Sequence, residues 1–216
     1  MREKKAGDMT QARTPLPLIV AALATLLILV AIALEVAGKQ GILFDMDLWI
    51  NQNVANLQNP FLLIFATEIN DYFLPIGIAF IIVLFAFMLI IKRKRSAFLI
   101  AFSSVAAILA DYAVEILVPR ARPDNAVIQV SGNSFPSGHA LLATVLFLLL
   151  AISFAGDIRG RANRYIFIGL NLALMILISL SRVYLNIHWM SDVFASFDMG
   201  FFVVILGLLV LRAAKK

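Results

Sequence analysis

Residues 16–34 read "LPLIVAALATLLILVAIAL", a run without a charged side chain. A helix rises about 1.5 Å per residue, so about 20 apolar residues cross the ~30 Å hydrocarbon core of a bilayer. The basic start "MREKK" would also suit a secretory signal peptide, but the apolar region of a signal peptide is shorter, about 7–15 residues. The stretch therefore predicts a retained membrane-spanning helix.

Five further apolar stretches follow along the chain: Tyr72–Ile91, Ala97–Val118, Ser137–Phe154, Tyr165–Val183 and Trp189–Leu211. The 216 residues are 62% hydrophobic and 14% charged, against roughly 45–50% and 25% in soluble domains. The alternating pattern of a membrane β-strand is absent, and an open sheet would leave backbone groups unpaired in lipid. We therefore expect an all-α protein, a bundle of six transmembrane helices over residues 16–211. Residues 1–15 and 212–216 would be cytoplasmic segments.

Basic side chains are concentrated in alternate connections between these spans. Fourteen of the 18 lysines and arginines lie in the N-terminal segment, in "KRKR" (residues 92–95), in residues 159–164 and in the tail. Because cytoplasmic loops carry an excess of such residues, both termini are expected in the cytoplasm. Lys39, Arg120, Arg122 and Arg182 remain on the outer side, where the arginines need another explanation. We attribute the net charge of +5 to topology rather than to a nucleic-acid partner.

The segment between the first two spans, Gly41–Asn70, alternates between polar and apolar stretches. We expect one or two short interfacial helices there, with Trp49 anchored at the boundary. "NDYFLP" (residues 70–75) is expected to separate them from the second span, since Asn and Asp favour turns and Pro75 lacks an N–H. The segment could be a packed lid without chemistry or a sideways entrance for a membrane lipid.

Two outer connections collect the remaining polar residues. They read "VPRARPDNAVIQVSGNSFPSGHA" (residues 118–140) and "SLSRVYLNIHWMSD" (residues 179–192). Both histidines of the chain and all three outer arginines lie in them. The predicted topology brings these two distant segments to one membrane surface.

The start of the fourth span has the pattern of an anion site. Pro136 suits the first turn of a helix, where an N–H would have no intrahelical partner. The backbone N–H groups of Ser137, Gly138 and His139 would then point out of the positive end of the helix, an arrangement that binds phosphate. Gly138 would let an oxyanion approach the main chain closely.

His188 and Asp192 are spaced for one face of a helix. A carboxylate there can accept the Nδ1–H of the imidazole and leave Nε2 free as a nucleophile or base. His139 could supply a proton, and the forked guanidinium groups of Arg122 and Arg182 could hold phosphoryl oxygens. These parts suit phosphoryl transfer. Two histidines without grouped carboxylates predict no metal site, and no cofactor is expected.

These residues resemble the three signature motifs of the type 2 phosphatidic acid phosphatase (PAP2) superfamily. The matches are RP at Arg122–Pro123, PSGH at Pro136–His139, and SR-x5-H-x3-D from Ser181 to Asp192. The resemblance covers about residues 41–211. It implies a six-helix membrane protein with an outward-facing site, acting on lipid phosphates or diphosphates such as phosphatidate, phosphatidylglycerophosphate or polyisoprenyl diphosphates.

The resemblance also implies a role for each residue. His188 would attack phosphorus to form a phosphohistidine, Asp192 would hold its ring, and His139 would protonate the leaving group and later activate water. The phosphoryl oxygens would be bound by four groups: Arg122, Arg182, Ser137 and the N–H of Gly138. No metal would take part.

One position departs from the family pattern, because Glu115 stands where the first motif has a lysine. Three explanations remain open. Arg120 could supply the missing positive charge, Glu115 could pair with Arg120 or Arg122 and orient it, or the protein could be a weakened relative.

Other functions compete with hydrolysis. The same site could pass the phosphoryl group to a second lipid. His139 and His188 could instead be the axial ligands of a haem in an electron carrier. Asp111 and Glu115 could serve a proton-coupled transporter, although the inverted repeats typical of that class are not visible. The sequence predicts neither the particular lipid nor the oligomeric state.

Overall fold

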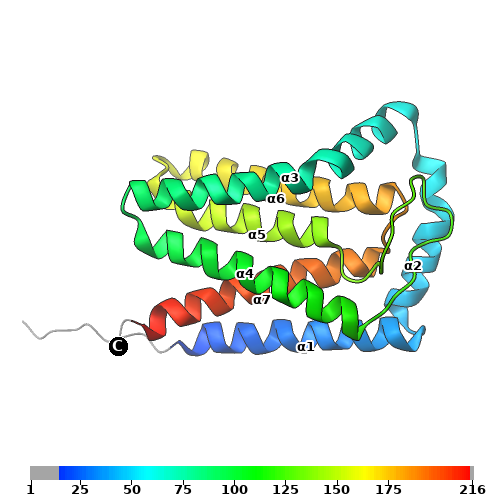
Figure 1. The fold of residues 1–216 in the computed structure, drawn as a ribbon, viewed down its shortest axis with the longest axis horizontal. Coiled ribbons are helices and arrows are strands. Elements are labelled where there is room, and N and C mark those ends of the chain that lie inside the picture. The colour runs from blue at the N-terminus through cyan, green and yellow to red at the C-terminus, as the bar shows by residue number, and fades with distance from the viewer. Residues whose placement is uncertain (1–14, 215–216) are drawn as a thin grey trace, which may run out of the picture.

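The computed structural model describes residues 15–214, and its helices run side by side as a bundle (Figure 1). Six of the described helices are long and apolar enough to cross a membrane, which confirms the predicted fold class. They are α1 (Leu16–Gly38), α3 (Pro60–Ile90), α4 (Lys94–Leu117), α5 (Gly138–Phe154), α6 (Arg161–Tyr184) and α7 (Met190–Ala213). The predicted cytoplasmic segments 1–15 and 212–216 lie largely outside the described residues.

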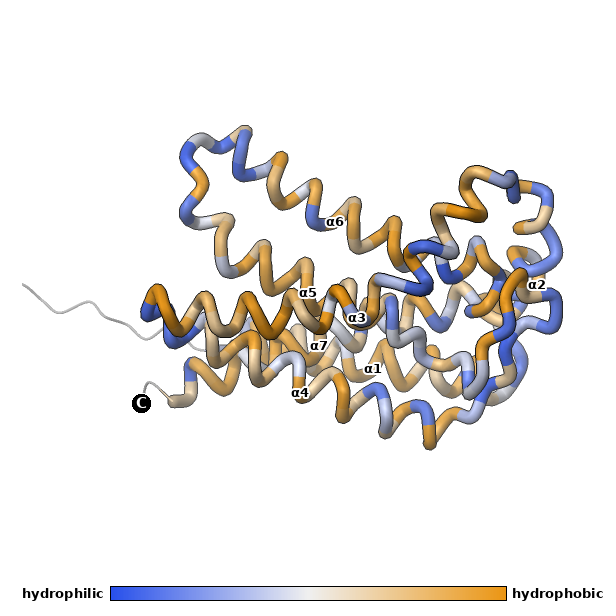
Figure 2. The backbone as a smooth tube through the Cα atoms, turned by 45° about the horizontal axis from the view of Figure 1, so that its top comes forward, coloured by the Kyte–Doolittle hydropathy of each residue, from blue (hydrophilic) through white to orange (hydrophobic). Residues whose placement is uncertain are grey.

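Short helices complete the described chain. The predicted interfacial region contains α2 (Ile42–Asn53) and a 3-10 turn, η1 (Val54–Leu57), and a second turn, η2 (Ala155–Asp157), follows α5. Figure 1 shows α2 lying across one end of the bundle, beside the long connection between α4 and α5. The last described helix, α7 (Met190–Ala213), ends at the opposite end of the bundle (Figure 1). Hydrophilic residues gather at the two ends and hydrophobic residues along the helices between them (Figure 2).

The predicted break before the second span is wrong. Helix α3 continues from Pro60 to Ile90 with Pro75 inside it. At 1.5 Å per residue it is about 46 Å long, more than the bilayer core requires. Proline removes one helical hydrogen bond and bends the helix, but membrane helices tolerate it when neighbouring groups satisfy the backbone. The early part of α3 is inclined away from the other helices (Figure 1), so one helix serves both as a span and as a wall of the α2 end.

The core is built around α5. This helix packs against α4, α6 and α7, and α7 also packs against α1. The α5–α7 contact depends on Gly200, because a Cβ there would lie 2.7 Å from the Cβ of Thr144. Both helices begin at the end of the bundle where α2 lies (Figure 1). Both predicted motifs that contain a histidine lie at these starts.

Candidate active site

His188 lies in the short connection between α6 and α7 and is buried. Its Nδ1 is 2.7 Å from the carbonyl oxygen of Ser134 and 3.4 Å from Oδ2 of Asp192. A carbonyl can only accept, so Nδ1 carries the proton and Nε2 carries the lone pair. The expectation that Asp192 accepts this proton needs correction, since the short hydrogen bond goes to the main chain of the preceding loop. Asp192 remains at ion-pair distance.

The free nitrogen of His188 faces Arg122. The Nη1 of Arg122 lies 3.1 Å from Nε2 of His188 and donates to the carbonyl oxygen of Ile187 at 2.8 Å. The carbonyls of Gly132 and Asn133 accept from the other side of the guanidinium, at 3.2 and 2.9 Å. Main-chain oxygens therefore fix a positive charge directly beside the lone pair.

Burial also keeps the His188 ring neutral. It lowers the pKa of His188 below its ordinary value, because the charged imidazolium would lose its hydration. The carboxylate of Asp192 opposes this shift, whereas the positive charges of Arg122 and Arg182 add to it. Since an unperturbed histidine has a pKa of about 6.5, the ring is neutral and nucleophilic at pH 7.

His139 is the second residue of α5 and is held by α3. Its Nε2 donates to the main-chain oxygen of Asn70 at 3.1 Å. The side-chain oxygen of Asn70 accepts a hydrogen bond of 2.8 Å from Nη1 of Arg182, whose side chain is almost completely buried. The Nε of Arg182 is buried without a partner among residues 15–214. Charge interactions also link His139 to Arg182, His188 and Arg122, so the four predicted groups converge.

Asn70 is a site residue that the sequence analysis missed. Its position before Asp71 and Pro75 predicts a turn. In the structure it lies inside α3 and contacts both His139 and Arg182. The feature that marks Asn70 as a candidate site residue is its polar amide side chain, which lies within a helix otherwise apolar enough to span a membrane.

The start of α5 differs in two details from the prediction. Helix α5 begins at Gly138, so Pro136 precedes the cap residue Ser137 instead of occupying the first turn. The backbone N–H of Ser137 is not free, because it donates to Oγ of Ser196 at 2.8 Å. The hydroxyl of Ser137 is buried without a partner in the described chain. The donors left for an anion are this hydroxyl and the first-turn N–H groups of Gly138 and His139.

Arg120 lies two residues before Arg122 but has different partners. Its Nη1 donates to Oγ of Ser191 at 2.7 Å and to Oδ1 of Asp192 at 2.5 Å, and its Nη2 donates to Asp47 at 2.7 Å. The guanidinium carbon lies 5.0 Å from the centre of the Trp189 ring. Nη1 thus has two protein partners and Nη2 has one, so the guanidinium is turned toward protein carboxylates, which argues against the phosphate contact expected of it.

Glu115 has no ion pair to an arginine within residues 15–214. Its main-chain oxygen accepts from Asn133 at 3.4 Å, and its carboxylate lies near Gly132. The expected direct pairing with Arg120 or Arg122 is therefore absent from this part of the chain. Burial lowers the pKa of Arg122, and the negative charges of Asp192 and, more weakly, Glu115 oppose this shift, so the Glu115 carboxylate acts on Arg122 from a distance.

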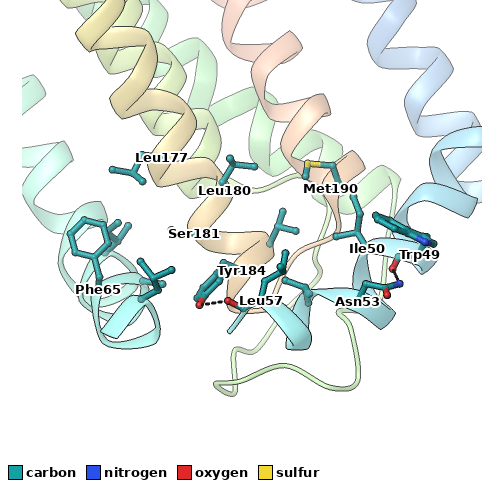
Figure 3. A pocket seen from close by; sticks show the side chains of 15 residues that line it. Trp49, Ile50, Asn53, Leu57, Phe65, Leu177, Leu180, Ser181, Tyr184 and Met190 are labelled. Atoms are coloured by element: carbon teal, nitrogen blue, oxygen red, sulfur yellow. Dashed lines mark hydrogen bonds between the residues drawn. The ribbon is translucent and has the colours of Figure 1, made fainter. Parts of the chain in front are cut away.

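An apolar cavity of about 430 Å³ lies beside this polar cluster. Its walls come from α2, η1, α3 and α6, with Met190 of α7 (Figure 3). The hydroxyl of Tyr184 donates to the carbonyl of Leu57 at 3.1 Å across one wall. Ile69 and Ser181 line the cavity, and they are the chain neighbours of Asn70 and Arg182. The cavity therefore lies next to the polar cluster, and most of its lining side chains are apolar. Within residues 15–214, no group of three histidine or acidic side chains could hold a metal ion.

Comparison with known proteins relates this arrangement to named relatives. Residues 59–216 match the family model described as the PAP2 superfamily. The chain is 32% identical over 88 residues to phosphatidylglycerophosphatase B of Bacillus subtilis (strain 168), covering 38% of this chain and 42% of that protein. It is 28% identical over 176 residues to an undecaprenyl-diphosphatase of Sulfolobus acidocaldarius, covering 76% of this chain and 77% of that protein. The first match spans less than half of the relative.

The fold is also that of a solved membrane protein. The crystal structure of a transmembrane PAP2 type phosphatidylglycerolphosphate phosphatase from Bacillus subtilis superposes with a TM-score of 0.77. The two chains are 21% identical, and the match covers 91% of this chain and 98% of the other. This likeness establishes a shared fold.

Proposed function

The chain belongs to the PAP2 superfamily, and from that premise we propose that it is an integral membrane phosphatase that hydrolyses a lipid phosphate or polyprenyl diphosphate through a phosphohistidine. One observation carries the proposal. The Ser134 carbonyl holds the Nδ1 proton of His188, which leaves the Nε2 lone pair beside the Arg122 guanidinium. A neutral nucleophile next to a fixed positive charge is what attack on a phosphate dianion requires.

The proposed reaction has two steps. In the first, Nε2 of His188 attacks phosphorus, the bond to the lipid oxygen breaks, and His139 in its doubly protonated form gives its Nδ1 proton to that oxygen while Nε2–H stays on the Asn70 carbonyl. Arg122 exchanges its contact with Nε2 for a phosphoryl oxygen, while Arg182, the Ser137 hydroxyl and the N–H of Gly138 bind the others. In the second step water attacks the phosphohistidine, His139 takes the proton, and inorganic phosphate leaves. Neither step calls for a metal ion.

The apolar cavity supports a lipid substrate. Several of its wall residues are large, apolar and partly exposed on the bundle surface, including Leu62, Phe65, Leu177 and Leu180. A lipid tail lying there would place its head group toward Asn70 and Arg182. The named relatives act on phosphatidylglycerophosphate and undecaprenyl diphosphate, and both have a long apolar tail next to a phosphate.

Phosphate release from purified protein tests the function. We expect inorganic phosphate from at least one member of a panel of phosphatidate, phosphatidylglycerophosphate and polyprenyl diphosphates. Release should survive EDTA, be blocked by vanadate and be lost in His188→Ala. An Asp45→Asn variant, altered at an exposed position of α2, is the matched control. Transfer of the phosphate to a second lipid instead of water would replace the hydrolase by a phosphotransferase, and EDTA-sensitive release would refute the metal-free route.

The side of the membrane is tested separately. We propose that the α2 end faces outward, because the basic connections 92–95 and 159–164 lie at the other end. The chain has no cysteine, so single cysteines can be introduced at two exposed positions, Asp124 and Arg161. A membrane-impermeant maleimide should label Asp124→Cys in intact cells and Arg161→Cys only after lysis. The reverse pattern would place the site in the cytoplasm.

A further inference from the structure

Asp47 is a buried carboxylate for which the proposed reaction has no use. It lies on α2, outside the PAP2 motifs, and is 1% exposed. Its Oδ1 accepts from the backbone N–H of Ser191 at 2.9 Å, and its Oδ2 accepts from the Ser191 hydroxyl and from Nη2 of Arg120. Burying a carboxylate is costly unless its charge is paired. Packing of α2 against the bundle would not by itself require a buried carboxylate, so we expect Asp47 to have a further role.

Arg120 connects Asp47 to the candidate catalytic pair. The same guanidinium binds Asp47 through Nη2 and Asp192 through Nη1. Asp192 uses its other oxygen, Oδ2, to accept from the N–H of Trp189 at 2.9 Å, and that oxygen lies 3.4 Å from Nδ1 of His188. One arginine thus divides a single positive charge between two buried carboxylates, of which only Asp192 lies beside the imidazole.

We propose that Asp47 and Arg120 are positioning residues, and that the bridge Asp47–Arg120–Asp192 both holds the Asp192 carboxylate next to His188 and sets how strongly its charge acts on the ring. The bridge rests on the proposed role of His188 as the nucleophile. It also accounts for the interfacial helix, since α2 delivers Asp47 to the start of α7. Three asparagines, Asn51, Asn125 and Asn186, tie α2 to the two motif-bearing connections beside it.

The sign of the effect follows from the charges that face His188. Asp192 favours the imidazolium, and Arg122 and Arg182 oppose it. His139 faces the ring from α5, and the Asp47–Arg120 pair stands behind Asp192. Removing the charge of Arg120 leaves Asp192 uncompensated, which favours the protonated ring. Removing the charge of Asp47 frees Arg120 to neutralise Asp192 more completely, which favours the neutral ring.

The test measures the His188 pKa directly. The chain contains two histidines, so ring nitrogen NMR of histidine-labelled protein gives two titrations, and a His139→Gln variant assigns them. We expect Arg120→Gln to raise the His188 pKa, and Asp47→Asn to lower it, each by about one unit. In an Asp192→Asn background both shifts should shrink, because the effect passes through that carboxylate. Asp45→Asn on the same helix should leave the titration unchanged.

Activity supplies a second measurement. Asp47→Asn and Arg120→Gln should lower kcat by up to about 100-fold with little change in KM, since the bridge positions the nucleophile without touching substrate. Arg120→Lys keeps the charge but reaches one carboxylate at a time, so it should return the His188 pKa toward wild type and restore part of kcat. This variant also serves if Arg120→Gln does not fold.

Several outcomes would overturn the bridge. They are pKa shifts of the same sign in Asp47→Asn and Arg120→Gln, titrations that match wild type in folded protein, or shifts that persist undiminished without Asp192. The NMR result does not depend on turnover. Loss of the proposed phosphatase function would therefore leave it readable, and failure of the bridge would leave the phosphatase proposal standing.

Discussion

Replacing Asn70 with alanine removes one hydrogen-bond acceptor from the buried Arg182. The side-chain oxygen of Asn70 accepts from Nη1 of Arg182 at 2.8 Å, and Arg182 is 1% exposed. The main-chain oxygen that holds His139 stays in place, because alanine keeps the backbone. The substitution therefore tests the orientation of Arg182 separately from the histidine.

The expected size follows from the type of bond lost. A hydrogen bond to a charged group contributes about 1.5–3 kcal/mol. Each 1.36 kcal/mol of lost transition-state stabilisation lowers a rate about tenfold. If Arg182 clamps a phosphoryl oxygen, kcat/KM of Asn70→Ala should fall about 10-fold to 150-fold. The free energy of unfolding should fall by a similar amount, because the guanidinium is left underbonded in the core.

A second substitution separates stability from activity. In Asn70→Asp the new carboxylate can pair with Arg182, so thermal stability should match or exceed that of Asn70→Ala. Activity should drop further, since the carboxylate offsets the positive charge and repels phosphate. The assay is kcat/KM for the lipid found by the phosphate-release panel, together with the thermal midpoint in detergent.

Asn163→Ala is the matched control, at an exposed asparagine near the start of α6. It should leave kcat/KM and the thermal midpoint within error of wild type. Asn70→Ala with wild-type kcat/KM, or Asn70→Asp more active than Asn70→Ala, would refute the reasoning about Arg182.

Three further predictions concern the tail cavity, the helix packing and the pH profile. Ala66→Phe fills part of the cavity and should displace about two methylene groups of a lipid tail, each worth about 0.8 kcal/mol. The KM for a long-chain lipid phosphate should therefore rise about tenfold. An equal rise in KM for a short-chain phosphate would place the tail elsewhere. Gly200→Ala should lower the free energy of unfolding by about 1–3 kcal/mol, because its Cβ would meet Thr144. Gly169→Ala, where a Cβ would have nothing within 4 Å, should be neutral or slightly stabilising. The thermal midpoints of the two variants test this, and equal shifts would contradict it. The folded-state pKa of His188 lies below its unfolded value of about 6.5, so its contribution to stability is complete above pH 6.5 and is lost as the pH falls through the lowered pKa. The acidic limb of kcat/KM should therefore lie below pH 6.5, and a limb above that value would refute a nucleophile neutralised by burial.

The membrane spans were predictable because each is a local property of the chain. A run such as residues 16–34 has to satisfy its backbone hydrogen bonds internally in lipid, and only a helix does so within one segment. The six predicted spans match six helices, with ends displaced by a few residues where a helix extends beyond its apolar run. The exception is α3, where Asn70 and Pro75 suggested a turn. Contacts with other helices stabilise the helical conformation there, and the sequence of one segment does not show those contacts.

The candidate site was predictable as a set of residue types but not as a set of partners. His139 and His188 could be placed at one end of the bundle, because the number of spans between them decides which end each one reaches. The partner of each polar group depends on positions set by several helices together. The i, i+4 spacing of His188 and Asp192 predicted a hydrogen bond between them. In the structure Nδ1 of His188 lies closer to the Ser134 carbonyl, and the spacing gives no indication of that partner.

Arg120 and Arg122 show the division most clearly. They are two residues apart in one loop, and from the sequence both were candidates for the phosphate. Chain order, hydrophobicity and charge determined that both arginines lie at the α2 end. They decide which segments cross the lipid and therefore which end of the bundle each connection reaches. Only the tertiary structure decided that Arg122 contacts His188 while Arg120 joins Asp47 to Asp192. Buried hydrogen bonds and ion pairs act over a few ångströms, and those distances are set only when α2 and α7 have packed against the loop.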